Sequence, residues 1–258
     1  MPELPDIEIF SRTIKNKYAG KKLLKIRLLV DKQTKDPQSA LSSALEGSWL
    51  RDVYRSGKEF RMRFSNQQIL GIHLMLTGDL FPFERKNEHK FSIVEFNFSD
   101  GTGMVLTDRM RNAHVKLNPE DKKGIDALDK ALNYKALKEI LNSKAVIKNV
   151  LLNQNKIRGI GNSYSDEILW ASGISPFSIA AALPDDKIKE LLRNIKAVMR
   201  NAIRQIEKSY PERMQGEIKE FLKIHSGKIK TSPTGATILN VKRGMLKTFY
   251  TGEQVVYK

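Results

Sequence analysis

A glycine-rich stretch at residues 154–176 carries the residue types that bind phosphate. It reads QNKIRGIGNSYSDEILWASGISP, with Gly159 and Gly161 close together and Asn162 at the expected N-cap of a following helix. Glycines let backbone N–H groups approach a bulky anion, and a helix N-terminus adds its positive dipole end. Two basic side chains in the same stretch supply charge: Lys156 and Arg158. The pattern favours a phosphodiester site, and an ordinary helix–loop–helix with glycines for tight packing is the alternative.

The first ten residues, MPELPDIEIF, place prolines and acids directly against an apolar helical pattern. Taken alone, Pro2, Glu3 and Asp6 are typical of a helix start, because proline fits the first turn and acids suit the positive helix end.

Four further residues have types that catalyse reactions or bind nucleic acid. Lys58 follows a glycine turn in YRSGKEF, a place where a lysine is usually solvated. His73 lies inside the apolar run LGIHLMLTGDL and is more typical of a satisfied core residue. Arg109 and Arg111 lie in the basic loop DRMRNAHVK, where they either reach nucleic acid or solvate a turn.

The composition indicates an anionic partner. The 258 residues include 45 Lys+Arg against 29 Asp+Glu, a net charge of +16, and nucleic acid is the commonest partner of such a chain. No apolar run approaches the ~18 residues of a membrane span, and no signal peptide is expected. The chain has no cysteine, and its four histidines lack ligand spacing, so we expect no disulfide and no metal site.

The hydrophobic patterning predicts two kinds of region. Residues 5–18 have helical spacing, and short β-rich runs separated by turns fill the chain to about residue 117, which favours a helix-covered β-sandwich. Helices and a closing hairpin around KRG (242–244) are expected after a boundary near 118–130. The expected helices are residues 126–142, 146–153, 162–172 and 185–208.

Several of these segments together resemble the formamidopyrimidine-DNA glycosylase and endonuclease VIII family. The resemblance covers nearly the whole chain, through PELPD, RSGKEF, the IHLMLTG run, GIGNSYSDEILWASGISP and KTFY. It implies an α+β fold in three parts: a helix and β-sandwich domain (1–120), a helical helix–two-turn–helix domain (121–225) and a C-terminal hairpin finger (226–258).

The resemblance also implies roles for particular residues. Removal of Met1 would expose the secondary amine of Pro2, which attacks the deoxyribose C1′ atom, displaces a damaged base and forms a Schiff base before the strand is cut. Glu3 matches the acid/base carboxylate, and Lys58 matches a lysine that holds phosphate beside the lesion. Asn162 with the backbone of Gly161 matches the phosphate clamp, and the damaged base must leave the stack.

The sequence departs from the family pattern in four places. Asp6 replaces the usual glutamate of PELPE, and the four zinc-binding cysteines of the finger are missing, which predicts a zincless finger. The arginine near the hairpin tip is out of register, and its nearest candidates are Arg243 and Lys247. DRMRNA replaces the Pro-Arg-Arg-Phe loop of the 8-oxoguanine branch, which leaves oxidised pyrimidines and other lesions open.

These observations predict a bifunctional DNA glycosylase and AP lyase that acts without a cofactor on damaged double-stranded DNA. We expect a monomer in the cytoplasm, associated with the bacterial nucleoid through DNA and not with membranes. The alternatives are a non-enzymatic DNA-binding protein with the same fold and, less favoured, a basic RNA- or ribosome-associated protein. The Pro2–Glu3 pair favours the enzyme, because a binding module needs no proline amine beside an acid.

Overall fold

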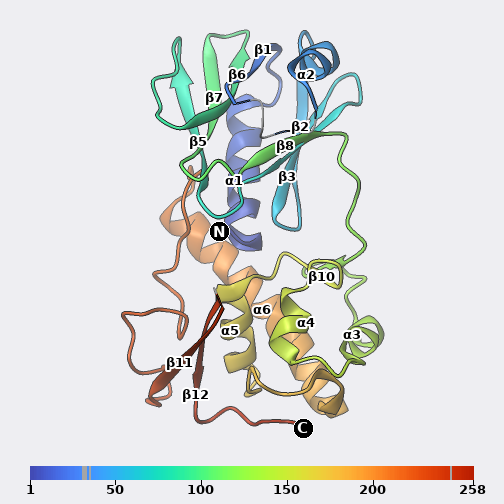
Figure 1. The fold of residues 1–258 in the computed structure, drawn as a ribbon, viewed down its shortest axis with the longest axis vertical. Coiled ribbons are helices and arrows are strands. Elements are labelled where there is room, and N and C mark those ends of the chain that lie inside the picture. The colour runs from blue at the N-terminus through green and yellow to red at the C-terminus, as the bar shows by residue number, and fades with distance from the viewer. Residues whose placement is uncertain (31–33, 35, 245) are drawn as a thin grey trace. The chain divides into compact units, whose positions relative to one another are not determined.

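The computed structural model describes residues 1–30, 34, 36–244 and 246–258 (Figure 1). The chain divides into two compact units, residues 1–121 with 206–217, and residues 122–205 with 218–258. Besides the end of the long helix described below, the described residues of the first unit form these helices and strands: α1 (Leu4–Tyr18), β1 (Leu23–Leu28), α2 (Gln38–Leu45), β2 (Leu50–Ser56), β3 (Glu59–Phe64), β4 (Ile69–His73), β5 (Gly78–Glu84), β6 (Ser92–Phe98), β7 (Thr102–Asp108) and β8 (His114–Leu117).

The strands of the first unit form two antiparallel four-stranded sheets. One sheet has the order β1-β6-β7-β5 and the other the order β2-β3-β4-β8. In β3, Phe60, Met62 and Phe64 are buried on one side, as their alternation predicts. The apolar side chains of both sheets and of α1 form one core, which includes Ile7, Phe10 and Ile14 at helical spacing. The expected helix and β-sandwich are therefore confirmed.

Two elements of this unit were not expected from the sequence. Helix α2 is short and rich in serine, and its buried face consists of Leu41 and Leu45 alone. Strand β5 contains a proline, Pro82, yet it pairs with β7 along its whole length. Pro82 is tolerated because β5 is an edge strand of its sheet, where one side of the backbone needs no partner.

In its described residues, the second unit contains the remaining helices and four short strands, which form two two-stranded sheets. Its elements are β9 (Ile125–Asp126), α3 (Tyr134–Leu141), α4 (Ile147–Leu152), β10 (Ile157–Arg158), α5 (Asn162–Ala171), the 3₁₀ helix η2 (Ala180–Ala182), α6 (Asp185–Ser209), β11 (Ile238–Arg243) and β12 (Leu246–Thr251). Helix α6 continues beyond this unit, since residues 206–217 pack with the first one. The contacts thus define two compact units, and the expected division into three parts stays a prediction.

The helix expected over 126–142 is wrong in its first half, because acidic side chains cap turns there. Asp126 accepts the N–H of Leu128, and Asp129 accepts the N–H of Ala131. These local bonds compete with helix formation. The helix begins only after Asn133, whose side chain accepts the N–H of Ala136 at 3.0 Å.

The C-terminal hairpin packs within the second unit through β12. Strands β11 and β12 pair in continuous register from Ile238 with Thr251 to Arg243 with Leu246. Lys242 and Arg243 therefore lie in β11, and of the predicted turn KRG only Gly244 is a turn residue. Phe249 and Thr251 are buried, and the N–H of Ser175 donates to the carbonyl of Val255 in the tail that follows.

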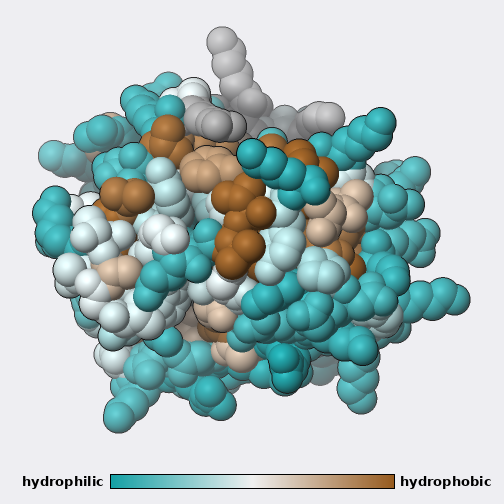
Figure 2. All heavy atoms as spheres, turned by 90° about the horizontal axis from the view of Figure 1, so that it is seen from below, coloured by the Kyte–Doolittle hydropathy of each residue, from teal (hydrophilic) through white to brown (hydrophobic). Residues whose placement is uncertain are grey.

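Hydrophilic side chains cover most of the face drawn in Figure 2, and hydrophobic ones gather there in small groups. None of the described helices is both long and apolar enough to cross a membrane.

Candidate active site and nucleic-acid interface

The start of α1 is closed by a reciprocal pair of acidic side chains. Asp6 Oδ2 accepts the backbone N–H of Glu3 at 3.0 Å, and the Glu3 side chain accepts the backbone N–H of Asp6. Such a capping box satisfies two helix donors at once. Pro2, Glu3 and Asp6 are all buried, so the backbone around residue 2 is held in one place.

Lys58 is not a solvated lysine, since it is only 8% exposed. It lies in the β2–β3 turn beside Gly57, whose φ of +64° lies in the left-handed region that favours glycine. Arg55 connects this turn to α1, because its guanidinium donates to Glu8 Oε2 at 2.9 Å and to the Gly57 carbonyl at 3.2 Å. The first unit thus holds Lys58 on a turn tied to the first turns of α1.

Asp108 organises the loop that carries Arg109 and Arg111. Its carboxylate accepts three backbone N–H groups, those of Met110, Asn112 and Ala113, and the hydroxyl of Thr77 in the β4–β5 loop. Burial alone would raise the pKa of Asp108, but these hydrogen bonds outweigh it and hold the pKa below its ordinary value.

The side chains at the tips of these two loops point to solvent. Arg109, Met110 and Arg111 are exposed, and Leu76 in the β4–β5 loop is 47% exposed. His73, at the end of β4, accepts the N–H of Met75 through Nδ1 and stacks on His114, with ring centroids 5.5 Å apart. His73 is therefore a half-buried residue at a strand end, where its ring makes contacts within the first unit.

In the second unit, α5 begins at Asn162, where the expected range 162–172 begins, but the expected N-cap is wrong. Gly161 is the N-cap and Asn162 is the first helical residue. The Asn162 side chain does not cap the helix, because its Nδ2 atom donates to the carbonyl of Lys247 on β12 at 2.9 Å. An amide nitrogen carries two N–H groups, and this contact uses one of them. The structure thus brings together Gly161, Asn162 and Lys247.

Lys247 itself is exposed, and its ammonium lies 5.0 Å from the centroid of the Phe249 ring. Arg243 ends β11 opposite Leu246, and its side chain lies outside the described part of the structure. The predicted site residues fall in both units. The first unit contains Pro2, Glu3, Lys58, Arg109 and Arg111, and the second contains Gly161, Asn162 and Lys247.

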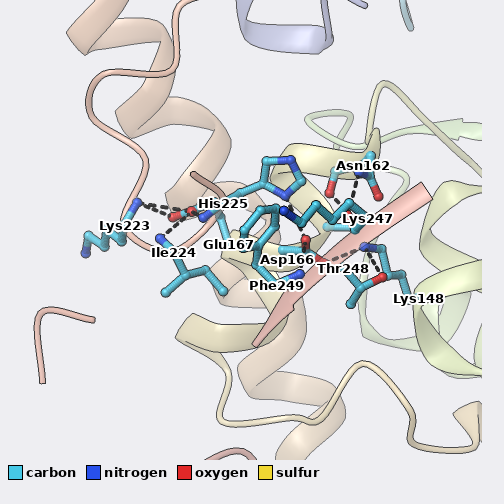
Figure 3. A network of polar contacts seen from close by, with 11 residues as sticks. Lys148, Asn162, Asp166, Glu167, Lys223, Ile224, His225, Lys247, Thr248 and Phe249 are labelled. Carbon is cyan, nitrogen blue, oxygen red and sulfur yellow. Dashed lines mark hydrogen bonds and ion pairs between the residues drawn. The ribbon is translucent and has the colours of Figure 1, made fainter. Parts of the chain in front are cut away.

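A buried ionic network joins α5 to the hairpin (Figure 3). Asp166 on α5 is 1% exposed and receives Lys148 Nζ at 2.6 Å, His225 Nδ1 at 2.7 Å and the N–H of Phe249 at 2.9 Å. Lys148 also donates to Thr248 Oγ1 at 2.9 Å. Asp166 therefore fixes β12 against α5, one turn after the residue that contacts Lys247.

Glu167, the next residue, holds the segment that leads to the hairpin. Its carboxylate accepts the consecutive backbone N–H groups of Lys223, Ile224 and His225 at 2.8–3.1 Å. Burial raises the pKa of Glu167, although these hydrogen bonds act in the opposite direction.

Sequence reasoning missed the roles of Asp108, Asp166 and Glu167. The one available signal for the last two was the acidic pair directly before the apolar half of the helix NSYSDEILWA, because buried acids are normally paired or hydrogen-bonded. Among the described residues, no group of three or more His, Cys, Asp or Glu side chains is arranged to hold a metal ion.

Two family models match the chain. The formamidopyrimidine-DNA glycosylase N-terminal domain matches residues 1–115, and the formamidopyrimidine-DNA glycosylase H2TH domain matches residues 124–212.

Relatives over the full length carry the same family name. A formamidopyrimidine-DNA glycosylase of Lactobacillus gasseri is 30% identical over 100% of both chains. That of Mycoplasma genitalium is 32% identical over 88% of this chain and 86% of its own.

Solved structures share the fold. A complex of Lactococcus lactis Fpg with DNA containing an abasic site superposes with a TM-score of 0.87 at 22% identity, covering 96% of this chain and 97% of that one. A complex of MutM with DNA containing carbocyclic 8-oxo-G gives a TM-score of 0.87 at 24% identity, covering 97% and 98%.

The chain therefore belongs to the formamidopyrimidine-DNA glycosylase family. Membership makes the protein a DNA-binding DNA glycosylase of base excision repair.

Proposed function

We propose that the protein excises a damaged base and then cleaves the DNA strand through a Schiff base on Pro2. The observation that carries this proposal is the buried, capped start of α1, where Pro2 lies directly before Glu3. A proline amine exposed by removal of Met1 is a secondary amine, and an α-amino group with a pKa near ~8 is partly neutral at pH 7. The amine attacks C1′, and Glu3 transfers protons to the sugar and the departing base.

We further propose that the DNA backbone is held by Lys58 and by the set formed by Gly161, Asn162 and Lys247. The burial of Lys58 supports a positioned cation, and the start of α5 supports a phosphate contact because it carries no acid in its first turn. Arg243 is a further candidate in this set. The protein is expected to act as a monomer in the cytoplasm, on damaged double-stranded DNA and without a cofactor.

The flipped nucleotide leaves a gap in the duplex that a protein side chain has to fill. Leu76 and Met110 are large apolar side chains about half exposed on loops joined through Asp108, which suits them to this role. Arg109 and Arg111 flank Met110, and their exposure supports the proposal that they contact phosphate. The loop DRMRNA has no phenylalanine, so oxidised pyrimidines and other lesions are candidate substrates on an equal footing with 8-oxoguanine.

The test is borohydride trapping with protein verified by mass spectrometry to begin at Pro2. Reduction of an imine should leave a stable protein–DNA adduct at residue 2 on abasic DNA and on at least one oxidised base. The panel should contain oxidised purines, oxidised pyrimidines and an abasic site. If no member of the panel gives an adduct, the proposal is wrong and the protein binds DNA without Schiff-base chemistry.

Two matched variants separate the steps of the reaction. Protein that retains Met1 should bind DNA and fail to cleave it, because the proline nitrogen is then part of a peptide bond. Glu3→Gln should keep some cleavage of abasic DNA but lose base excision, since only excision has to expel a base. The Gln side chain can still accept the Asp6 N–H, so α1 should keep its cap.

A further inference from the structure

The chain's N-terminal amine has a carboxylate partner that the preceding mechanism does not use. The ammonium group of Met1 forms an ion pair with Glu217 Oε1, and the two side chains are 32% and 20% exposed. Both residues belong to the first unit. We propose that Glu217 is a catalytic residue that serves the Pro2 amine as its proton acceptor and as the counter-ion of the iminium intermediate. This inference rests on the proposed function of Pro2.

The segment that carries Glu217 is fixed to α1 at several points. Its first residues are bound by Thr13 Oγ1, which donates to the Pro211 carbonyl at 3.2 Å. The ion pair of Lys17 with Glu212 adds little to this attachment, because the Glu212 side chain is 79% exposed. Met214 is 3% exposed and packs in the core of the first unit. A carboxylate on such an anchored segment costs little ordering entropy when it binds the amine.

A second anchor lies directly beside Glu217. The N–H of Gly216 donates to Asp79 Oδ1 on β5 at 2.6 Å, and Gly216 has a φ of +71°. The turn at residue 216 is therefore held from the sheet side, which leaves the position of Glu217 well defined.

The other acids near the amine are already engaged by the helix. Asp6 Oδ2 accepts the N–H of Glu3, and the Glu3 carboxylate accepts the N–H of Asp6. A carboxylate that caps a helix is positioned by that bond, which restricts its movement toward a proton on the amine. Glu217 makes its contact with the amine itself.

Removal of Met1 moves the amine by one residue only. Bond lengths place successive backbone nitrogens about 3 Å apart, so the Pro2 amine lies within about 6 Å of the Glu217 carboxylate. A change of side-chain rotamer covers that distance.

The chemistry balances with Glu217 as both acceptor and donor. In the resting ion pair, the protonated Pro2 amine passes one proton to Glu217, which frees the nitrogen lone pair. On an abasic site the nitrogen then forms a bond to the aldehyde carbon C1′, and its remaining proton moves to the aldehyde oxygen. Glu217 returns its proton to the departing hydroxyl, which leaves as water, and the C=N⁺ bond forms. The pair begins as ammonium–carboxylate and ends as iminium–carboxylate, with no co-reactant.

The experiment compares Glu217→Gln with Glu212→Gln, a matched loss of an acid on the same segment. Protein beginning at Pro2 is mixed with abasic-site DNA, and the single-turnover rate of borohydride trapping is measured from about pH 5 to pH 9. We expect Glu217→Gln to slow trapping at pH 7 about tenfold or more. The midpoint of the pH profile of the trapping rate should fall by roughly one pH unit, because the variant lacks the negative charge that stabilises the protonated amine. Glu217→Asp should restore part of the rate, and Glu212→Gln should match the wild-type protein.

DNA affinity supplies an independent readout. Glu217→Gln should bind abasic-site DNA as tightly as the wild type or slightly tighter, because it removes a negative charge from a DNA-facing site. The inference is overturned if Glu217→Gln traps at the wild-type rate with the wild-type midpoint. It is also overturned if the variant slows trapping without moving the midpoint and unfolds at a lower temperature, which would indicate a structural role. Absence of trapping by the wild-type protein would instead overturn the proposed function.

Discussion

Helices α1 and α5 begin with residues of opposite kinds, because α1 has acidic side chains at its N-terminus and α5 has none. At α1, Glu3 and Asp6 satisfy each other's backbone N–H groups and place negative charge at the positive helix end. At α5 the N-cap is Gly161, which has no side chain to supply, and the first turn has no acid. Its first residue, Asn162, is directed to the Lys247 carbonyl.

The difference indicates which helix start is suited to bind an anion. Carboxylates at α1 oppose the positive end of the helix dipole and would repel a phosphate, so we expect this end to position a nucleophile and its acid. The start of α5 keeps its positive dipole end, and the backbone carbonyl of Lys247 contacts Asn162 there. We therefore expect two helices of similar local geometry to take different roles because of the few residues at their first turns.

The strongest test of this difference is to introduce an acidic side chain at the first residue of α5. Asn162→Asp should lower DNA affinity by about 10- to 100-fold, because it removes a donor and puts a negative charge beside phosphate. Asn162→Ala should lower affinity less, by about tenfold. Equilibrium binding to abasic-site DNA checks both, and equal effects of the two variants would show that charge at this helix end is unimportant.

The comparison extends to Asp108, a carboxylate that satisfies backbone N–H groups of a loop instead of a helix. Asp108→Asn should reduce the free energy of unfolding at pH 7 by about 1–3 kcal/mol. Because the folded-state pKa lies below the ordinary value, this stabilisation is present above about pH 4 and is lost as the pH falls through the folded pKa. Denaturant unfolding measures the free energy of unfolding of both proteins at pH 7 and pH 3, and the difference between them should be smaller at pH 3. An equal difference at both pH values would contradict the lowered pKa of Asp108.

A smaller effect is expected from opening the cap of α1. Asp6→Ala leaves the N–H of Glu3 without its acceptor and should cost about 1 kcal/mol, or roughly 2–4 °C in Tm. DNA affinity should stay within twofold of the wild type, since this helix start is not a phosphate site. Thermal unfolding and binding measured on the same sample check the prediction, and a large loss of affinity with unchanged Tm would reverse the roles of the two helices.

No effect at all is expected from metal removal. The hairpin of β11 and β12 lacks cysteine and pairs in continuous register, so we expect it to fold without zinc. Chelator should leave Tm and trapping unchanged, and elemental analysis should find no stoichiometric zinc. Tight zinc with chelator-sensitive trapping would show that other residues replaced the cysteines.

Much of the fold was predictable because its signals are local and periodic. The spacing of Ile7, Phe10 and Ile14 predicted α1, and the alternation of Phe60, Met62 and Phe64 predicted β3. The serine-rich α2 and the proline-containing β5 were not predicted, because contacts with residues distant in the sequence determine their conformation.

The candidate site was predictable only in part, for a similar reason. PELPD and GIGN are short motifs, so Pro2, Glu3 and Asn162 could be singled out from the sequence. Glu217 and Asp166 depend on contacts between residues far apart in the chain, Glu217 with Met1 and Asp166 with Lys148, His225 and Phe249. Nothing in the local sequence encodes such distant pairs.

The attachment of the hairpin through Asp166 and Glu167 bears on what a hairpin without cysteine needs in order to stay in place. Those carboxylates lie on α5, outside the hairpin, and they hold β12 and the chain that leads to β11. The position of the hairpin base is therefore set by hydrogen bonds to a neighbouring helix and does not depend on ligands at the hairpin tip.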